Sequence, residues 1–431
     1  MSNNPRGNIF RHVGIYQVCV VKSTEVEMES ESVMDLVPFQ APRLAGSALS
    51  FFAALTRLPG LGSILLNKVK TDNQFHVVRE FASTLDNMPV YLPLRPPTAD
   101  VLLEHFRLAS SFSLDDLAKT VINPPKDGAF HRWTIQDYTR WYRDGTTTCP
   151  LGDWSRWRWV GSNSSSSLRC RRPQSDVHAR SVQHLSAADS VQCLSAGWNY
   201  PSVKPSLVQP PPFVLAPTKD LGKLRVGVFT PYAEPSLLRG YRSTIEQLKE
   251  LGAEVIEVEI PHLNAIHLSH NITSLKEFVD FYDRYPISSF SPDVQINLGV
   301  GNVVDALEYL AAQKVRGYAM QVTEEMFDQV DIFLTPATAQ LAPRLDRDVF
   351  KAGLSDLATT TALMRFIILG NMVGIPGLTV PVAYDMETNL TISVLLQAIH
   401  LNEHKLFAVA RHLEAHMLSK EPSVYYSVLN A

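Results

Sequence analysis

Residues 224–260, LRVGVFTPYAEPSLLRGYRSTIEQLKELGAEVIEVEI, carry the pattern that decides the fold of this 431-residue chain. The stretch opens with an apolar run at 224–229 that is typical of a buried strand. Residues 236–251 then follow a helical pattern that ends at Gly252. Residues 253–260 alternate as a second strand. A helix between two strands is a βαβ unit, so the sequence predicts an α/β sheet.

The rest of the C-terminal part continues this alternation of helices and strands. We predict a long helix at 303–330, a buried strand at 331–335, a helix at 358–373, a strand at 378–382 and a closing helix at 403–418. Elements of both kinds in this order predict a sheet that is flanked by helices.

The overall composition is that of an ordinary globular protein, with 45% hydrophobic and 19% charged residues. A net charge of −4 gives no reason to expect nucleic acid as a partner. The four cysteines lack CxxC spacing, so they indicate reduced intracellular thiols and predict no metal or other cofactor. The chain has no uninterrupted apolar run of about eighteen residues, so we expect no membrane-spanning helix.

An apolar helical hairpin is predicted between residues 47 and 70. Residues 47–57 and 63–69 form its two helices, and the Pro and Gly residues at 58–62 form the turn. Large apolar side chains cover both helices: Phe51, Phe52, Leu55, Leu61, Ile64, Leu65 and Leu66. They either pack on the domain core or form a cap that lies on a membrane surface, with Arg57, Lys68 and Lys70 at the level of the headgroups.

The chain changes character between Cys149 and Ser202, where WSRWRW, SNSSSS and CRRPQS follow one another without a helical or strand period. Basic and aromatic residues interleave here, as they do in proteins that bind single-stranded nucleic acid. No predicted element around this segment would present such a patch, so we do not expect nucleic acid to bind.

Several segments are similar to the amidase signature family. DIFLTP at 331–336, followed by LAP at 341–343, resembles that family's strand ending in a Thr-Pro turn. Residues 363–366, 370–371 and 374–382 resemble its late helix and strand.

The N-terminal half narrows the resemblance to plant-type fatty acid amide hydrolases. The similar pieces are Ala41-Pro42 with Leu44 and Gly46, Gly62-Ser63, Asp72-Asn73, and the helix with Trp133, Ile135, Asp137 and Tyr138. One departure follows Asp385, where Thr391, Ser393, Val394 and Leu395 replace the family's Gly/Pro loop and Gly-Leu-Gln strand.

The resemblance implies an incomplete amidase-signature fold, a mixed sheet flanked by helices with an N-terminal helical cap. Residues 1–100 would hold the N-terminal strand, a tether and the cap, and residues 101–148 the N-terminal part of the amidase domain. Residues 205–431 would hold its C-terminal part. Residues 149–204 would be an irregular segment that is read out of frame.

The family uses a Ser–cis-Ser–Lys triad, with Lys in a VKD motif and the serines in GGSSSGS and DGGGS-type loops. None of these motifs occurs in this sequence. Lys126-Asp127 lies in a Pro-rich loop upstream of where the catalytic Lys would fall, and we interpret it as a solvated turn. Ser164–Ser167 lack the flanking glycines of the serine loop. We therefore assign no catalytic residue.

A shifted reading frame accounts for the irregular segment. Tryptophan has the single codon TGG. A reading frame that starts one base later therefore encodes Gly at the positions of Trp154, Trp157 and Trp159. In that frame the codons can encode GVDGGGSVRIP, then three unassigned residues, then CGVVGLKAT. This string resembles the family's nucleophile motif, and the codon for its Ser overlaps the codon of Val160. The segment with the Lys and the bridging Ser would then be skipped after Thr148. An aberrant splice and an incorrect gene model would both produce this chain, and the transcript distinguishes them.

The resemblance implies hydrolysis of fatty acid amides (N-acylethanolamines) to free acid and amine, and the missing triad implies that this chain is inactive. The alternative is a non-enzymatic lipid- or membrane-binding protein that uses the apolar hairpin. An amidase rebuilt around Ser164–Ser167 is disfavoured, because a nucleophile and its base must be held within hydrogen-bond reach. The expected partners are an acyl amide or lipid and the surface of an internal membrane, and the oligomeric state is left open.

Overall fold

The computed structural model describes these residues: 43–87, 158–160, 169–171, 221–231, 233–280, 284–345, 349, 353–400 and 402–415. The predicted N-terminal strand, the predicted helix with Trp133 and Tyr138, Lys126-Asp127 and Ser164–Ser167 lie outside them.

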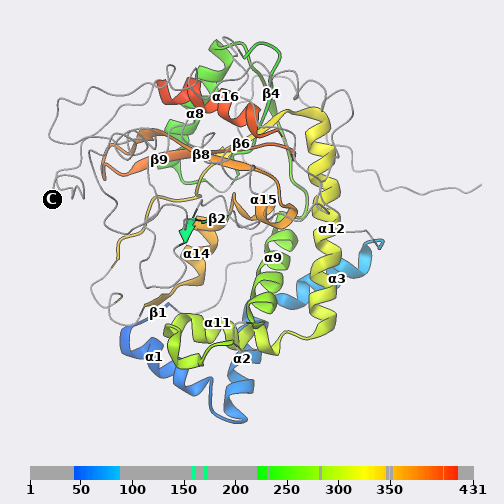
Figure 1. The fold of residues 1–431 in the computed structure, drawn as a ribbon, viewed down its shortest axis with the longest axis vertical. Coiled ribbons are helices and arrows are strands. Elements are labelled where there is room, and N and C mark those ends of the chain that lie inside the picture. Colours follow the sequence, from blue (N-terminus) through cyan, green and yellow to red (C-terminus); the bar gives the residue numbers. More distant parts are fainter. Residues whose placement is uncertain are drawn as a thin grey trace, which may run out of the picture.

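A five-stranded sheet in the order β5-β4-β6-β9-β8 forms the centre of the fold (Figure 1). Its strands are β4 (Arg225–Val228), β5 (Glu254–Glu257), β6 (Ile332–Pro336), β8 (Gly377–Tyr384) and β9 (Thr391–Gln397). The first three are mutually parallel, and β9 runs antiparallel to both of its neighbours, β6 and β8. The predicted mixed α/β sheet is therefore confirmed.

The βαβ unit predicted from residues 224–260 is β4, α8 (Pro235–Glu250) and β5. Proline at the first helical turn suits the start of α8, because its missing N–H would have no partner there. The helix ends in Gly252, whose φ of 88° is readily accessible to glycine. The amides of Gly252 and Ala253 donate to the carbonyls of Lys249 and Leu248, the two bonds of a Schellman motif.

Each face of the sheet packs against its own helices. On one face α8 and α16 (Glu403–Ala415) enclose a core with Val226, Leu334 and Tyr241. The Tyr241 hydroxyl donates to the Leu334 carbonyl (2.8 Å) and accepts from the Phe229 amide (3.2 Å), which ties β4 to β6. On the other face lies a larger, mainly helical core that includes Phe333 (Figure 1).

The helices of the larger core are α9 (Leu263–Phe278), α11 (Pro292–Val303), α12 (Ala306–Gln329), α14 (Leu357–Met364) and α15 (Ile368–Val373). The N-terminal helices α1 (Gly46–Leu55), α2 (Leu61–Asp72) and α3 (Phe75–Thr84) pack against it. The shorter elements are β1 (Leu44–Ala45), β7 (Leu354–Ser355), β2 (Arg158–Val160), β3 (Arg169–Arg171) and the 3-10 turn η2 (Ile287–Ser289).

Several predicted elements differ from the structure. The helix predicted at 358–373 is two helices, α14 and α15, separated by residues 365–367. The departure after Asp385 concerns residue types and is not contradicted: the segment 391–397 forms strand β9, and the Gln397 side-chain amide donates to the Phe366 carbonyl (3.2 Å). Within the segment predicted to be irregular, β2 and β3 pair as antiparallel strands.

Two lysines hold the junction between α11 and α12. Lys70 Nζ, from α2, lies 2.9 Å from Glu308 Oε1 and 3.3 Å from the Val303 carbonyl oxygen. Lys276 Nζ, from α9, lies 2.7 Å from the Val304 carbonyl oxygen. Carbonyls at the end of a helix have no intrahelical donor and attract cations. These contacts therefore fix α2, α9, α11 and α12 relative to one another.

Replacing Lys70 with Met should destabilise the protein by ~3–5 kcal/mol, because Glu308 would stay buried without its cation. The side chains of Lys70 and Glu308 are only 17% and 8% exposed. The matched control is Lys68→Met on the same helix, because Lys68 is 72% exposed in its pair with Asp72. Such exposed pairs contribute about 0.5 kcal/mol or less. Urea unfolding measures both variants, and equal losses would contradict the role given to Lys70.

Candidate functional site

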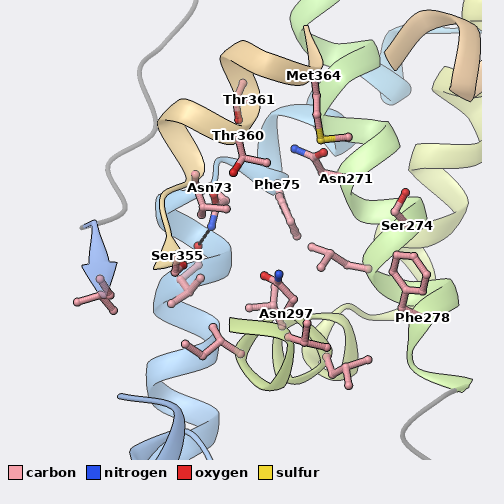
Figure 2. Close-up of a pocket in the computed structure, with 18 of the residues that line it drawn as sticks. Asn73, Phe75, Asn271, Ser274, Phe278, Asn297, Ser355, Thr360, Thr361 and Met364 are labelled. Carbon is pink, nitrogen blue, oxygen red and sulfur yellow. Dashed lines mark hydrogen bonds between the residues drawn. The ribbon is translucent and has the colours of Figure 1, made fainter. Parts of the chain in front are cut away.

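A cavity of about 530 Å³ lies among α9, α11, α14 and the junction of α2 with α3 (Figure 2). Most of the lining residues are apolar, including Phe75, Leu275 and Met364. The polar lining residues are Asn73, His267, Asn271, Ser274, Asn297, Ser355, Thr360 and Thr361. A cavity of this kind, mostly apolar with a few polar groups, is the usual form of a small-molecule site.

Helix α9 supplies one polar wall. His267, Asn271 and Ser274 are four and three residues apart, a spacing that places them on one face of a helix. Other faces of α9 are buried through Ile266 and Leu268. The helix is therefore enclosed, and its polar stripe faces the cavity instead of bulk solvent.

Helix α14 supplies the second wall, and its start is fixed by Asp356. This carboxylate accepts from the Thr359 amide (3.0 Å) as a helix N-cap and pairs with Arg43 (3.4 Å). The Thr360 hydroxyl donates to the Asp356 carbonyl (2.8 Å). Leu44 pairs with Ser355 through β1 and β7, which brings the N-terminal segment to the cavity.

The turn between α2 and α3 supplies the third wall. Asn73 follows the last residue of α2, and its amide donates to the Val69 carbonyl (2.7 Å). Gln74 then takes the left-handed conformation at φ 59°, and α3 starts at Phe75. This tight turn directs the buried Phe75 ring into the cavity beside Asn73 (Figure 2).

The described lining of the cavity is electrically neutral. No Asp, Glu, Lys or Arg occurs among the lining residues that the structure describes. Burial, with smaller effects from Arg365 and His270, lowers the pKa of His267 to about 3. His267 is therefore an uncharged imidazole at neutral pH.

The same residues do not form a nucleophile with its base. A hydroxyl nucleophile needs a base at roughly 2.6–3.2 Å. The Thr360 hydroxyl is bonded to a backbone carbonyl, and within the described ranges no lining hydroxyl is hydrogen-bonded to His267. The arrangement can hold a neutral, partly polar ligand by burial and hydrogen bonds.

The seven apolar hairpin residues are divided between core and solvent. Leu66 is buried against Gly299 of α11, and Phe52 lines the cavity. Leu55 and Leu65 are half-buried, whereas Phe51, Leu61 and Ile64 are exposed. The core interpretation therefore holds for the inner side of the hairpin. Lys70, predicted at the level of the lipid headgroups, is instead a part-buried partner of Glu308.

A model of the amidase family matches residues 152–407, more than half of the chain. The chain belongs to the amidase family. Residues 1–148 lie outside the matched range, whereas residues 152–204, part of the segment interpreted as out of frame, lie inside it.

Individual relatives match this amidase-family chain over a shorter stretch. A fatty acid amide hydrolase from Medicago truncatula is 31% identical over 233 residues, 50% of this chain and 37% of that protein. An amidase from Pseudomonas putida is 31% identical over 181 residues, 38% of this chain and 37% of that protein. Among solved structures, 6-aminohexanoate cyclic dimer hydrolase is 17% identical, with 53% of each chain covered and a TM-score of 0.41.

Neither a spanning helix nor a metal cluster occurs in the part of the chain that the structure describes. No described helix is both long and apolar enough to cross a membrane. The same residues contain no group of three or more His, Cys, Asp and Glu side chains placed to hold a metal ion.

Sequence reasoning missed every polar residue of this cavity. The available signal was the spacing of His267, Asn271 and Ser274, which stand among other polar residues such as Ser269 and Thr273. That spacing indicates a polar stripe, but it does not show whether the stripe faces water or a cavity. The partners Asn73 and Thr361 lie far away in the sequence, so only the fold brings them together.

Proposed function

We propose that this amidase-family chain binds a single-chain acyl amide in the cavity and does not hydrolyse it. The observation that carries the proposal is the uncharged, mostly apolar cavity, which lacks a paired nucleophile and base among its described lining residues. The ligand class is taken from the relatives, which are named as a fatty acid amide hydrolase and an amidase.

The cavity lining supports an acyl chain with a neutral polar end. Each buried methylene of such a chain contributes about 0.8 kcal/mol, and the ring of Phe75 and the side chains of Leu275 and Met364 offer apolar contact. An amide carries both donors and an acceptor, which suit the side chains of Asn271 and Thr361.

The absence of hydrolysis is proposed from the sequence. The three motifs that would hold the Lys and the two Ser of the triad do not occur in these 431 residues. The tryptophans at 154, 157 and 159 are explained by a nucleophile loop that is read out of frame. A chain without these groups can retain a ligand cavity, because the walls described here come from other segments.

The purified chain should release no ethanolamine from N-dodecanoylethanolamine beyond a mock purification, yet should bind this amide. Ser274→Phe should weaken binding by about tenfold or more, because the ring would fill the space that the ligand needs. The control is Ser63→Phe at an exposed position of α2. Titration calorimetry measures binding, and product analysis measures hydrolysis. Sustained turnover by the purified chain would refute the proposed inactivity.

A second proposed function, association with the surface of an internal membrane, is favoured by the outer side of the hairpin. Phe51 and Ile64 are 65% and 68% exposed, and Leu58 and Leu61 are also exposed. Exposed apolar side chains next to basic residues are typical of segments that lie in a membrane interface. Arg57 and Lys68 are exposed on the same hairpin and would face the headgroups.

Replacing both Phe51 and Ile64 with Ser should reduce co-sedimentation with anionic phospholipid vesicles by about tenfold, because each side chain would otherwise bury apolar area in the interface. The matched control replaces Leu307 and Leu310 of α12, which are 61% and 60% exposed. An equal reduction in both double variants, or none in either, would rule out a membrane surface formed by the hairpin.

A further inference from the structure

The cavity has a buried polar end and a more exposed end. His267 and Thr361 are 4% and 9% exposed, and Asn271, on α9, lies across from Thr361 of α14 (Figure 2), whereas Thr360 is exposed. Phe278 and Asn297, by contrast, are exposed to solvent. A ligand with a polar head can therefore place that head between α9 and α14 and leave its chain toward Phe278.

The residues that the structure describes at the buried polar end carry no charge of their own. Arg365 acts electrostatically on His267, and Asp356, at the start of α14, is paired with Arg43. Neither Arg365 nor Asp356 lines the cavity. His267 and His270 have pKa values lowered by burial, so both are neutral at neutral pH.

This neutrality discriminates between head groups. Asn and Thr side chains can both donate hydrogen bonds to, and accept them from, an amide or a hydroxyl. They therefore replace the hydrogen bonds with water that such a head group gives up when it enters the cavity. A carboxylate would lose its hydration, and none of the described lining residues is a cation that could pair with it, which is costly for any buried ion.

We infer that the cavity selects ligands with an uncharged head group and excludes the carboxylate of a fatty acid. The inference rests on the proposed ligand-binding role of the cavity and adds the property that decides which lipids enter it. An acyl amide and the fatty acid with the same chain would then differ strongly in affinity, although their apolar parts are identical.

Matched ligands test the inference on the full chain. Decanamide, 1-decanol and decanoate share one chain length and differ in the head group, and calorimetric titration at neutral pH compares them. We expect decanamide and 1-decanol to bind at least about tenfold more tightly than decanoate, since a buried unpaired charge costs more than the ~1.4 kcal/mol that corresponds to tenfold.

Asn271→Leu locates the head group. This variant keeps the size of the side chain but removes its hydrogen bonds, so decanamide should lose most of its advantage over decanoate. Asn264→Leu, about two helical turns away on α9 and outside the cavity, is the control and should leave the ratio unchanged.

The outcomes separate this inference from the proposed function. Equal binding of decanamide and decanoate would overturn the selectivity and leave ligand binding intact. Binding of neither ligand would overturn both. An unchanged ratio in Asn271→Leu would show that the head group does not lie between α9 and α14, which would also overturn the inference.

Discussion

The position of α11 depends on the two lysines that meet at its C-terminal end. Lys70 comes from α2 and Lys276 from α9, and both bind carbonyls of the turn that leads into α12. Because α2, α9 and α11 are also walls of the cavity, these contacts set the separation of the walls. The pair of Lys70 with Glu308 is part-buried, so the arrangement is stable only while both charges are present.

The cations that hold the cavity together are kept out of its lining. Lys70 is directed to Glu308, Lys276 to the end of α11, and Arg43 to Asp356. The interior is left with amides, hydroxyls and a neutral imidazole. Charged residues thus stabilise the helices around the cavity, while the described lining residues are uncharged. These two properties together favour a neutral amphiphile over an ion as the ligand.

The sequence predicted those elements whose signals are local. The unit β4-α8-β5 combines two apolar runs, an amphipathic helix and a terminating glycine, so each boundary is encoded next to the element. The hairpin of α1 and α2 was predicted for the same reason. Helices α9 and α11 were missed, because α9 is enclosed on most sides and has little amphipathic pattern, and α11 has a similarly weak pattern and two glycines, Gly299 and Gly301.

The site could not be predicted because it is made by long-range contacts. Asn73, Asn271 and Thr361 are each ordinary polar residues in the sequence, and nothing local marks them as neighbours. The family resemblance was visible in short motifs such as Thr335-Pro336, which form the end of β6. The proposal that this chain holds an amide without cleaving it is tested by native mass spectrometry of the chain mixed with decanamide. We expect a complex heavier by one intact decanamide that dissociates on denaturation. A covalent adduct with the mass of decanamide less ammonia, which survives denaturation, would contradict it.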